Sequence, residues 1–114
     1  MVLWIKRSVV LLALVGCDES EEKLCQESPW TYENTGEIFM LNWCTSCHHS
    51  DISSENRVPG TEGVNLNGFE NVTTFLGRIQ AVALAESPSM PPSGGPTEAE
   101  LERMREWITC GAPE

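Results

Sequence analysis

The residues with the most evident chemistry lie in the run Cys44–His48, which reads Cys-Thr-Ser-Cys-His. On a helical turn, residues three and four positions apart lie on the same side, so both thiols and the imidazole can face one partner. Several kinds of site use such a set: a disulfide, a thioredoxin-like thiol pair, a zinc site and the attachment site of a c-type haem. The surrounding sequence has to discriminate among them.

The context of the motif favours haem attachment. A thioredoxin-like pair needs a strand–helix–strand setting, and nothing before Cys44 has the pattern of a strand. A zinc site normally uses a second Cys/His pair at similar spacing, whereas Cys25 and Cys110 are isolated. A plain disulfide between Cys44 and Cys47 stays open. On the haem interpretation, Cys44 and Cys47 form thioethers with the vinyl groups, and His48 is the proximal ligand of the iron.

Met90 is the candidate for the distal iron ligand. Met40 and Met104 fall within expected helices, where Met usually fills gaps in a core. Met90 instead lies in the segment 87–96, whose prolines fix the backbone and make a stiff loop that can hold a thioether against iron. The alternatives are a merely buried Met90 with open coordination, or ligation by His49. His49 is a poor rival, because a residue next to the proximal ligand cannot easily reach the opposite face of the same haem.

Two helices are expected before and after the motif. The segment 35–43 has Ile38 and Leu41 on one stripe, with Phe39 and Trp43 on a neighbouring one, and it predicts a helix that runs into Cys44. Apolar residues at helical spacing predict a second helix over 72–85. Arg78 on that helix could pair with a haem propionate, although an exposed Arg is the commoner situation.

The last helix has clear boundaries. Thr97 and Glu100 form a capping box at its start, and Gly111 and Pro113 end it. Its apolar face consists of Leu101, Met104, Trp107 and Ile108.

The N-terminus has the layout of an export signal. Residues 1–16 carry Lys6 and Arg7 and then an apolar run too short to span a bilayer. The run ends at Leu14-Val15-Gly16-Cys17, which resembles the bacterial lipobox, and this resemblance implies lipidation of Cys17 and an anchored protein. Asp18 resembles an inner-membrane retention signal and favours the inner membrane. An ordinary secretory signal, or an uncleaved stub with Cys17 as a free thiol, is the alternative.

Residues 17–32 follow as the lipidated Cys and an acidic tether, which we expect to be a solvated linker. A docking patch is the other interpretation of its charge.

From the motif onwards the sequence resembles a known family, the small single-haem c-type cytochrome domains of planctomycetes and myxobacteria. The resemblance covers about residues 33–113 and rests on four segments: Cys44–His48, Gly63–Leu66, Met90–Pro96 and Trp107–Pro113. It implies an all-α, cytochrome c-like domain over 33–114, with about three to four helices around one covalent haem c and crossed N- and C-terminal helices. It makes Cys44 and Cys47 the thioether residues, His48 the proximal ligand and Met90 the distal ligand.

Cys25 and Cys110 depart from the family pattern. If the terminal helices cross as the resemblance implies, the two residues come together, and export to an oxidising compartment then predicts a Cys25–Cys110 disulfide. Two free or intermolecular thiols are the alternative.

Composition limits the possible functions. A chain of 114 residues with 40% hydrophobic residues and four Trp fits one ordered small domain, and a net charge of −10 disfavours nucleic acid as a partner. No nucleophile with a base and no paired-carboxylate site is evident, which disfavours an enzyme.

We therefore expect a monomeric one-electron carrier on the periplasmic side of a bacterial membrane, steered towards a redox partner with a basic docking patch. A haem-based ligand-binding or sensor module, and a haem-free, disulfide-stabilised lipoprotein interaction domain, are the alternatives.

Overall fold

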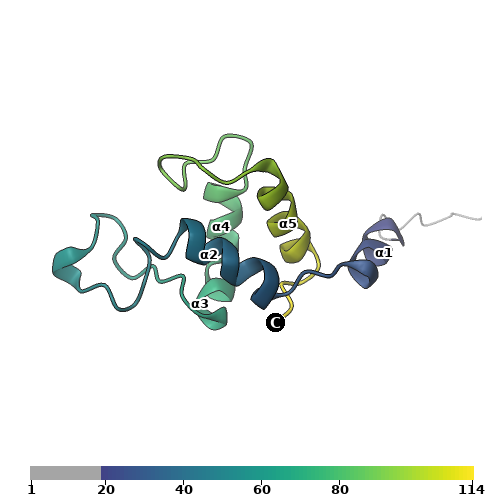
Figure 1. Cartoon of the computed structure of the whole chain (residues 1–114), viewed down its shortest axis with the longest axis horizontal. Helices are drawn as coiled ribbons and strands as arrows, with labels where there is room; N and C mark the ends of the chain where they lie inside the picture. The colour runs from purple at the N-terminus through teal and green to yellow at the C-terminus, as the bar shows by residue number, and fades with distance from the viewer. Residues whose placement is uncertain (1–18) are drawn as a thin grey trace, which may run out of the picture.

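The described part of the chain is entirely helical. The structure, a computed structural model, describes residues 19–114 and contains no strand within them (Figure 1). In chain order, the elements are α1 (Glu19–Glu27), the π-helical turn η1 (Tyr32–Gly36), α2 (Glu37–Trp43), the 3-10 turn η2 (Ser54–Asn56), α3 (Phe69–Thr74), α4 (Leu76–Ala83) and α5 (Glu98–Thr109). The all-α prediction is confirmed for these residues.

Helices α2 and α5 lie against each other and run in opposite directions. At one end, Gly36 just before α2 is so close to Trp107 of α5 that an added Cβ would stand 2.8 Å from the indole ring. At the other end, the indole Nε1 of Trp43 donates to Glu100 at the start of α5, over 3.2 Å. The segment η1–α2 therefore contacts α5 at two places, through the η1 turn and through Trp43.

The core forms where α3 and α4 meet this pair. Its largest fully buried side chains are Trp107, Met40, Met104 and Val72. The prediction that Met40 and Met104 fill the core is confirmed, since 1% and 0% of their surfaces are exposed.

The segment expected as a helix over 35–43 is helical, and only one of its two apolar stripes faces the core. Phe39 is buried and Trp43 is partly buried against the core, whereas Ile38 and Leu41 are 49% and 62% exposed. Of the two stripes, the one with Phe39 and Trp43 faces the core, and the one with Ile38 and Leu41 faces outwards. The tight approach of Gly36 to α5 decides which side of α2 faces inwards.

The helix expected over 72–85 is two helices, α3 and α4. The break lies at Phe75, whose backbone N–H donates to the carbonyls of both Asn71 and Val72. Its φ and ψ of −104° and 13° end the helical conformation, and α4 restarts at Leu76. Arg78 lies on α4 and is exposed.

The prediction for α5 is confirmed. The Thr97 hydroxyl accepts from the Glu100 backbone N–H over 3.2 Å, and the Glu100 carboxylate accepts from the Thr97 N–H over 2.7 Å. Met104 and Trp107 are buried, and Leu101 and Ile108 pack against the core. The helix ends at Thr109, and Gly111 then takes a φ of +91°, a left-handed conformation that glycine adopts without strain.

The acidic tether is not an irregular linker throughout. Within 17–32, residues Glu19–Glu27 form α1, which has no buried residue and stands apart from the other helices (Figure 1). Its helical conformation is favoured by three acidic residues in the first turn, where the helix dipole is positive. The exposure of α1 agrees with the expectation of a solvated segment.

A disulfide joins α1 to the end of α5. Cys25 and Cys110 are bonded with an S–S distance of 2.04 Å and a Cα–Cα distance of 5.2 Å, as predicted. Between residues 19 and 114, no helix is both long and apolar enough to cross a membrane. The predicted signal peptide 1–16 and the predicted lipidation site Cys17 lie outside the described residues.

Candidate haem attachment site

The chain leaves α2 in a further helical turn that carries the motif. The Cys44 N–H donates to the Met40 carbonyl over 2.9 Å, and the N–H groups of Cys47 and His48 both donate to the Cys44 carbonyl, over 3.2 and 3.0 Å. These bonds give the turn a helix-like repeat, so Cys44, Cys47 and His48 lie on one side of it. The structure thus brings together the three residues that the sequence assigned to covalent attachment and proximal ligation.

Both cysteines of the motif carry free thiols in the structure. Burial raises the pKa of the Cys44 thiol to about 11, so this side chain is uncharged at neutral pH. Thiol nucleophiles act as thiolates, so an uncharged thiol is poorly suited to a thioredoxin-like role. The cysteines at 25 and 110 are already paired with each other, so they cannot complete a zinc site with this turn.

His48 is oriented from two directions by the segment 64–66. Its Nδ1 lies 3.2 Å from the Val64 carbonyl oxygen, and its own carbonyl accepts from the Leu66 N–H over 2.9 Å. A carbonyl can only accept, so Nδ1 carries the proton and Nε2 keeps its lone pair. In metal-binding histidines, a hydrogen bond from the ring nitrogen that does not bind the metal fixes the tautomer and the orientation of the ring.

Arg57 organises the loop between His48 and Val64, and sequence reasoning missed it. Its guanidinium donates to the carbonyls of Ile52, Thr61 and His49 over 3.1, 3.0 and 2.7 Å, and also to the Asn65 side chain. One side chain thereby links both ends of the loop. No sequence signal could have revealed this role, since three of the four acceptors are backbone carbonyls.

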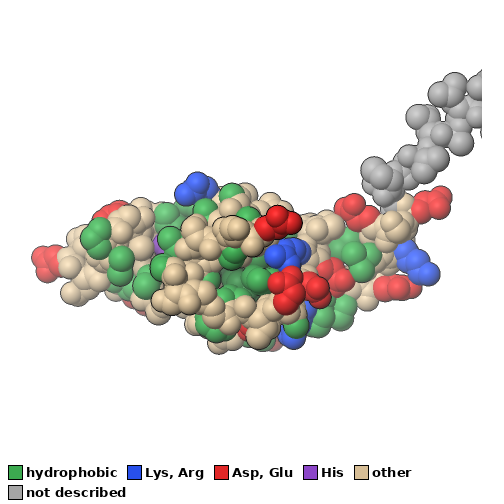
Figure 2. Space-filling model, turned by 90° about the horizontal axis from the view of Figure 1, so that it is seen from above, with side chains coloured by type: hydrophobic (Ala, Val, Ile, Leu, Met, Phe, Trp, Pro, Cys, Tyr) green, Lys and Arg blue, Asp and Glu red, His purple; other side chains and the backbone are tan. Residues whose placement is uncertain are grey.

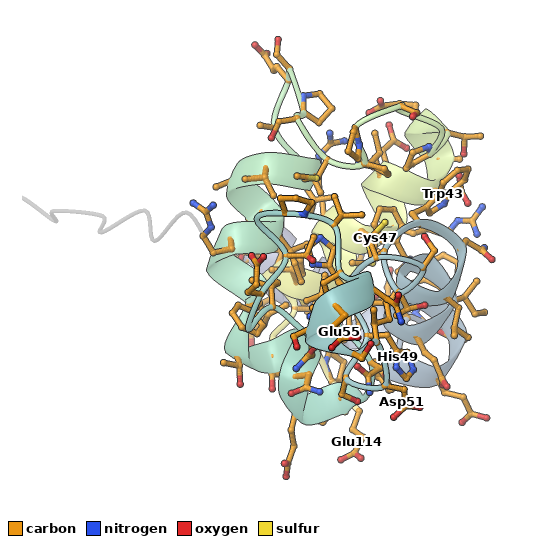
Figure 3. All side chains as sticks on the ribbon, turned by 90° about the vertical axis from the view of Figure 1, so that its left-hand side faces the viewer. Trp43, Cys47, His49, Asp51, Glu55 and Glu114 are labelled. Carbon is orange, nitrogen blue, oxygen red and sulfur yellow. A yellow bond between two sulfur atoms is a disulfide. The ribbon has the colours of Figure 1, made fainter. Side chains whose placement is uncertain are left out.

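His49 has only local partners. Its Nδ1 accepts from the Asp51 backbone N–H over 3.0 Å and lies 3.8 Å from the Asp51 carboxylate. The two side chains lie at the same end of the molecule, with Glu55 nearby in the view of Figure 3. This placement agrees with the expectation of a partly solvated His49.

Met90 lies in a separate loop, between α4 and α5. The N–H groups of Ser89 and Met90 both donate to the Val82 carbonyl, over 2.9 and 3.0 Å, which fixes the start of the loop to the end of α4. The Met90–Pro91 peptide bond is cis. The Met90 side chain is 39% exposed, so its thioether is accessible. The prediction of a merely buried Met90 does not hold.

The donor set fits a covalently attached haem. It offers two thiols on one turn, an imidazole with a free Nε2 and an accessible thioether in a loop fixed at its start. Hydrophobic side chains gather on the face that carries the Met90 loop, and a histidine is visible among them (Figure 2). Two cavities, of about 40 and 260 Å³, lie along α5. Neither is lined by a residue of the Cys44–His48 motif or by Met90.

Within the part of the chain that the structure covers, no group of three or more His, Cys, Asp or Glu side chains is placed to hold a metal ion. A haem site needs only one such residue on iron, so this finding does not bear on it.

Comparisons of the chain with models of known protein families, with curated proteins and with solved structures find no match. The assignment of the site therefore depends on its own residues and geometry.

Proposed function

We propose that this protein is an exported, lipid-anchored, single-haem c-type cytochrome that carries one electron between redox partners. The observation that carries the proposal is the turn Cys44–His48, in which His48 Nδ1 lies 3.2 Å from the Val64 carbonyl oxygen, a hydrogen bond that leaves Nε2 of the neutral ring free to bind a metal. A tautomer fixed in this way is expected of an iron ligand and has no use in a disulfide or a thiol redox pair.

The residues have separate roles in this proposal. Cys44 and Cys47 hold the group covalently, His48 is the proximal ligand, and Met90 is the distal ligand. The bound haem c would supply a one-electron Fe(III)/Fe(II) couple, whose reduced state a thioether ligand favours. The chain's own part is to orient His48 through the Val64 carbonyl and to hold the Met90 backbone on Val82. No proton transfer or substrate binding is required, so the proposed protein is not an enzyme.

In this proposal, the N-terminal residues determine the cellular location of the domain. Residues 1–16 serve as the signal, Cys17 carries the lipid, and the protein faces the periplasm, with the inner membrane favoured by Asp18. The Cys25–Cys110 disulfide supports an oxidising compartment, because such bonds persist mainly outside the cytoplasm.

The proposed partner is a redox protein with a basic docking patch, and this protein is proposed to bind it as a monomer. The chain has 17 acidic residues against 7 basic ones, and acidic side chains are visible at both ends of the face in Figure 2. Two of the basic residues are engaged within the fold: Arg57 binds loop carbonyls, and Arg105 pairs with Glu98 over 2.9 Å. Association should therefore be fast at low salt and slow down as salt rises. Nucleic acid is not a proposed partner.

The proposal is tested by the visible spectrum of the exported protein, oxidised and reduced, after extraction with acid acetone. We expect haem to stay with the polypeptide, and the oxidised protein to show a sulfur-to-iron charge-transfer band. Met90→Leu, which removes the sulfur at nearly constant volume, should lose that band. Met40→Leu is the matched control, because Met40 is buried in α2 and its replacement should leave the band intact.

Other outcomes point elsewhere. Absence of the band from the unmodified protein, together with rapid binding of carbon monoxide to the reduced protein, would favour a ligand-binding sensor. A colourless protein would favour a haem-free lipoprotein interaction domain and end the electron-transfer proposal.

A further inference from the structure

Trp43 lies where three parts of the molecule meet. It is the last residue of α2 and directly precedes Cys44 of the attachment motif. Its indole Nε1 donates to the Glu100 carboxylate at the start of α5, and its ring is partly buried against the core. Its ring also faces the loop that carries Met90, through the backbone of Gly95. Figure 3 shows Trp43 and Cys47 on the same side of the molecule.

The contact with Gly95 is too close for any side chain. A Cβ at Gly95 would overlap Cζ3 of Trp43 and lie within 3.0 Å of two further ring atoms, so the loop backbone packs directly against the six-membered ring of the indole. Gly95 has a φ of +124°, which only glycine adopts readily. Gly94, its neighbour, also has a positive φ of +69°, yet a Cβ there would meet nothing within 4 Å.

Glu100 secures the other edge of the indole. One carboxylate oxygen accepts from Trp43, and the other accepts from the Thr97 N–H of the helix cap. The carboxylate therefore joins the end of α2 to the end of the Met90 loop, where α5 begins. The start of the same loop is held separately, by the Val82 carbonyl.

We propose that Trp43, Gly95 and Glu100 form a clamp that positions the Met90 loop relative to the Cys44–His48 turn, and so determines whether Met90 stays on the iron. This inference rests on the proposed function. The three are positioning residues: they act by holding Met90 at its place and bind no haem themselves. Since the loop's fixed points are Val82 on one side of Met90 and the clamp on the other, loosening the clamp frees the side chain without unfolding the helices.

The test compares two matched pairs of variants. Gly95→Ala and Gly94→Ala both place a Cβ at a positive φ, but only Gly95→Ala strikes Trp43. Glu100→Ala and Thr97→Ala both break the capping box of α5, but only Glu100→Ala removes the acceptor of the Trp43 indole. The readouts are the sulfur-to-iron band, the rate of carbon monoxide binding to the reduced protein, and amide hydrogen exchange at Met90 and Gly94, whose N–H groups donate to the carbonyls of Val82 and Pro91.

We expect Gly95→Ala and Glu100→Ala to weaken the band and speed carbon monoxide binding. Exchange at Met90 and Gly94 should become about tenfold faster in both variants, because losing one contact of ordinary strength shifts an opening equilibrium by about that factor. Gly94→Ala and Thr97→Ala should keep the band and the slow exchange. Unfolding midpoints identify a variant that is merely less stable.

If both members of each pair show the same band, the same rate of carbon monoxide binding and the same exchange rates, the clamp proposal is wrong. A colourless protein would contradict the proposed function by itself. In that case the exchange rates still decide the inference: faster exchange in Gly95→Ala but not in Gly94→Ala supports the clamp, and equal exchange overturns it.

Discussion

The helices α2, α4 and α5 and the two loops 44–68 and 84–97 are held together by different forces. The helices bury apolar side chains completely, with Met104 and Trp107 at 0% exposure. The loops contribute Leu66 and Leu84 to this core, but their course also depends on single polar contacts, such as His48 with Val64 and the Arg57 guanidinium with three carbonyls. Burial energy is spread over many atoms, whereas a hydrogen bond fixes one direction. Stability and site geometry should therefore respond to different substitutions.

Two methionines give the largest contrast. Met104→Ala deletes a fully buried side chain and should lower the free energy of unfolding by about 2–5 kcal/mol, while the folded protein keeps its sulfur-to-iron band. Met90→Ala should do the reverse: it removes the band from a side chain that is already 39% exposed. Denaturant unfolding, followed by both circular dichroism and the visible band, checks both. Equal loss of stability in the two variants would contradict the separation.

The disulfide is expected to have the next largest effect. Replacing Cys25 and Cys110 together by Ser should cost about 2–4 kcal/mol, because the bond closes a loop with a sequence separation of 85. The pigment and its spectrum should be unchanged, since the bond lies away from the attachment motif. The shift of the denaturation midpoint measures the cost. A native mass that does not rise by two hydrogens on reduction would show that the bond is absent from the exported protein.

Arg57 should have a smaller effect, confined to its loop. Arg57→Gln removes charged hydrogen bonds to loop carbonyls and should cost about 1–2 kcal/mol, with faster amide exchange across 49–65. Arg57→Lys should not restore the slow exchange, because an ammonium cannot reproduce the guanidinium fork. Arg78→Gln, on the exposed side of α4, is the control and should change the stability by less than about 0.5 kcal/mol. Similar exchange in Arg57→Gln and Arg78→Gln would show that the loop does not depend on Arg57.

The smallest predicted effect is a pH dependence at Glu100. The Thr97 backbone N–H, helped by the Trp43 indole, lowers the pKa of Glu100 below its ordinary value, although burial opposes this. A lowered pKa means that the charged carboxylate stabilises the fold above the unfolded-state pKa, and that this contribution disappears as the pH falls through the folded-state pKa. Unfolding midpoints of the protein and of Glu100→Gln should therefore differ at neutral pH and converge in acid. A constant difference would contradict the assignment.

Features set by neighbouring residues were predictable from the sequence. Thr97 and Glu100 define the start of α5 through bonds within one turn, and the spacing of Cys44, Cys47 and His48 leads directly to the turn that carries them. The buried positions of Met40 and Met104 follow from their place in amphipathic helices.

Features set by distant partners were not predictable. The buried side of α2 depends on the approach of Gly36 to Trp107, more than 60 residues away along the chain. The apolar pattern also did not predict the break at Phe75, because a double hydrogen bond from its N–H produces this break. It did not predict α1 either, because the sequence of that helix is exposed and charged. Arg57 binds mainly backbone carbonyls, which leave no trace in side-chain identity.

The central claim is that the Cys44–His48 turn carries a covalent haem, and the intact mass of the exported chain under denaturing acid tests it most directly. We predict a mass greater than that of the processed polypeptide and its lipid by one haem, and loss of this increment when Cys44 and Cys47 are both replaced by Ser. Cys25→Ser/Cys110→Ser should keep the increment, since that pair forms the disulfide. A wild-type chain that carries no haem mass after expression with the haem-attachment machinery would contradict the account.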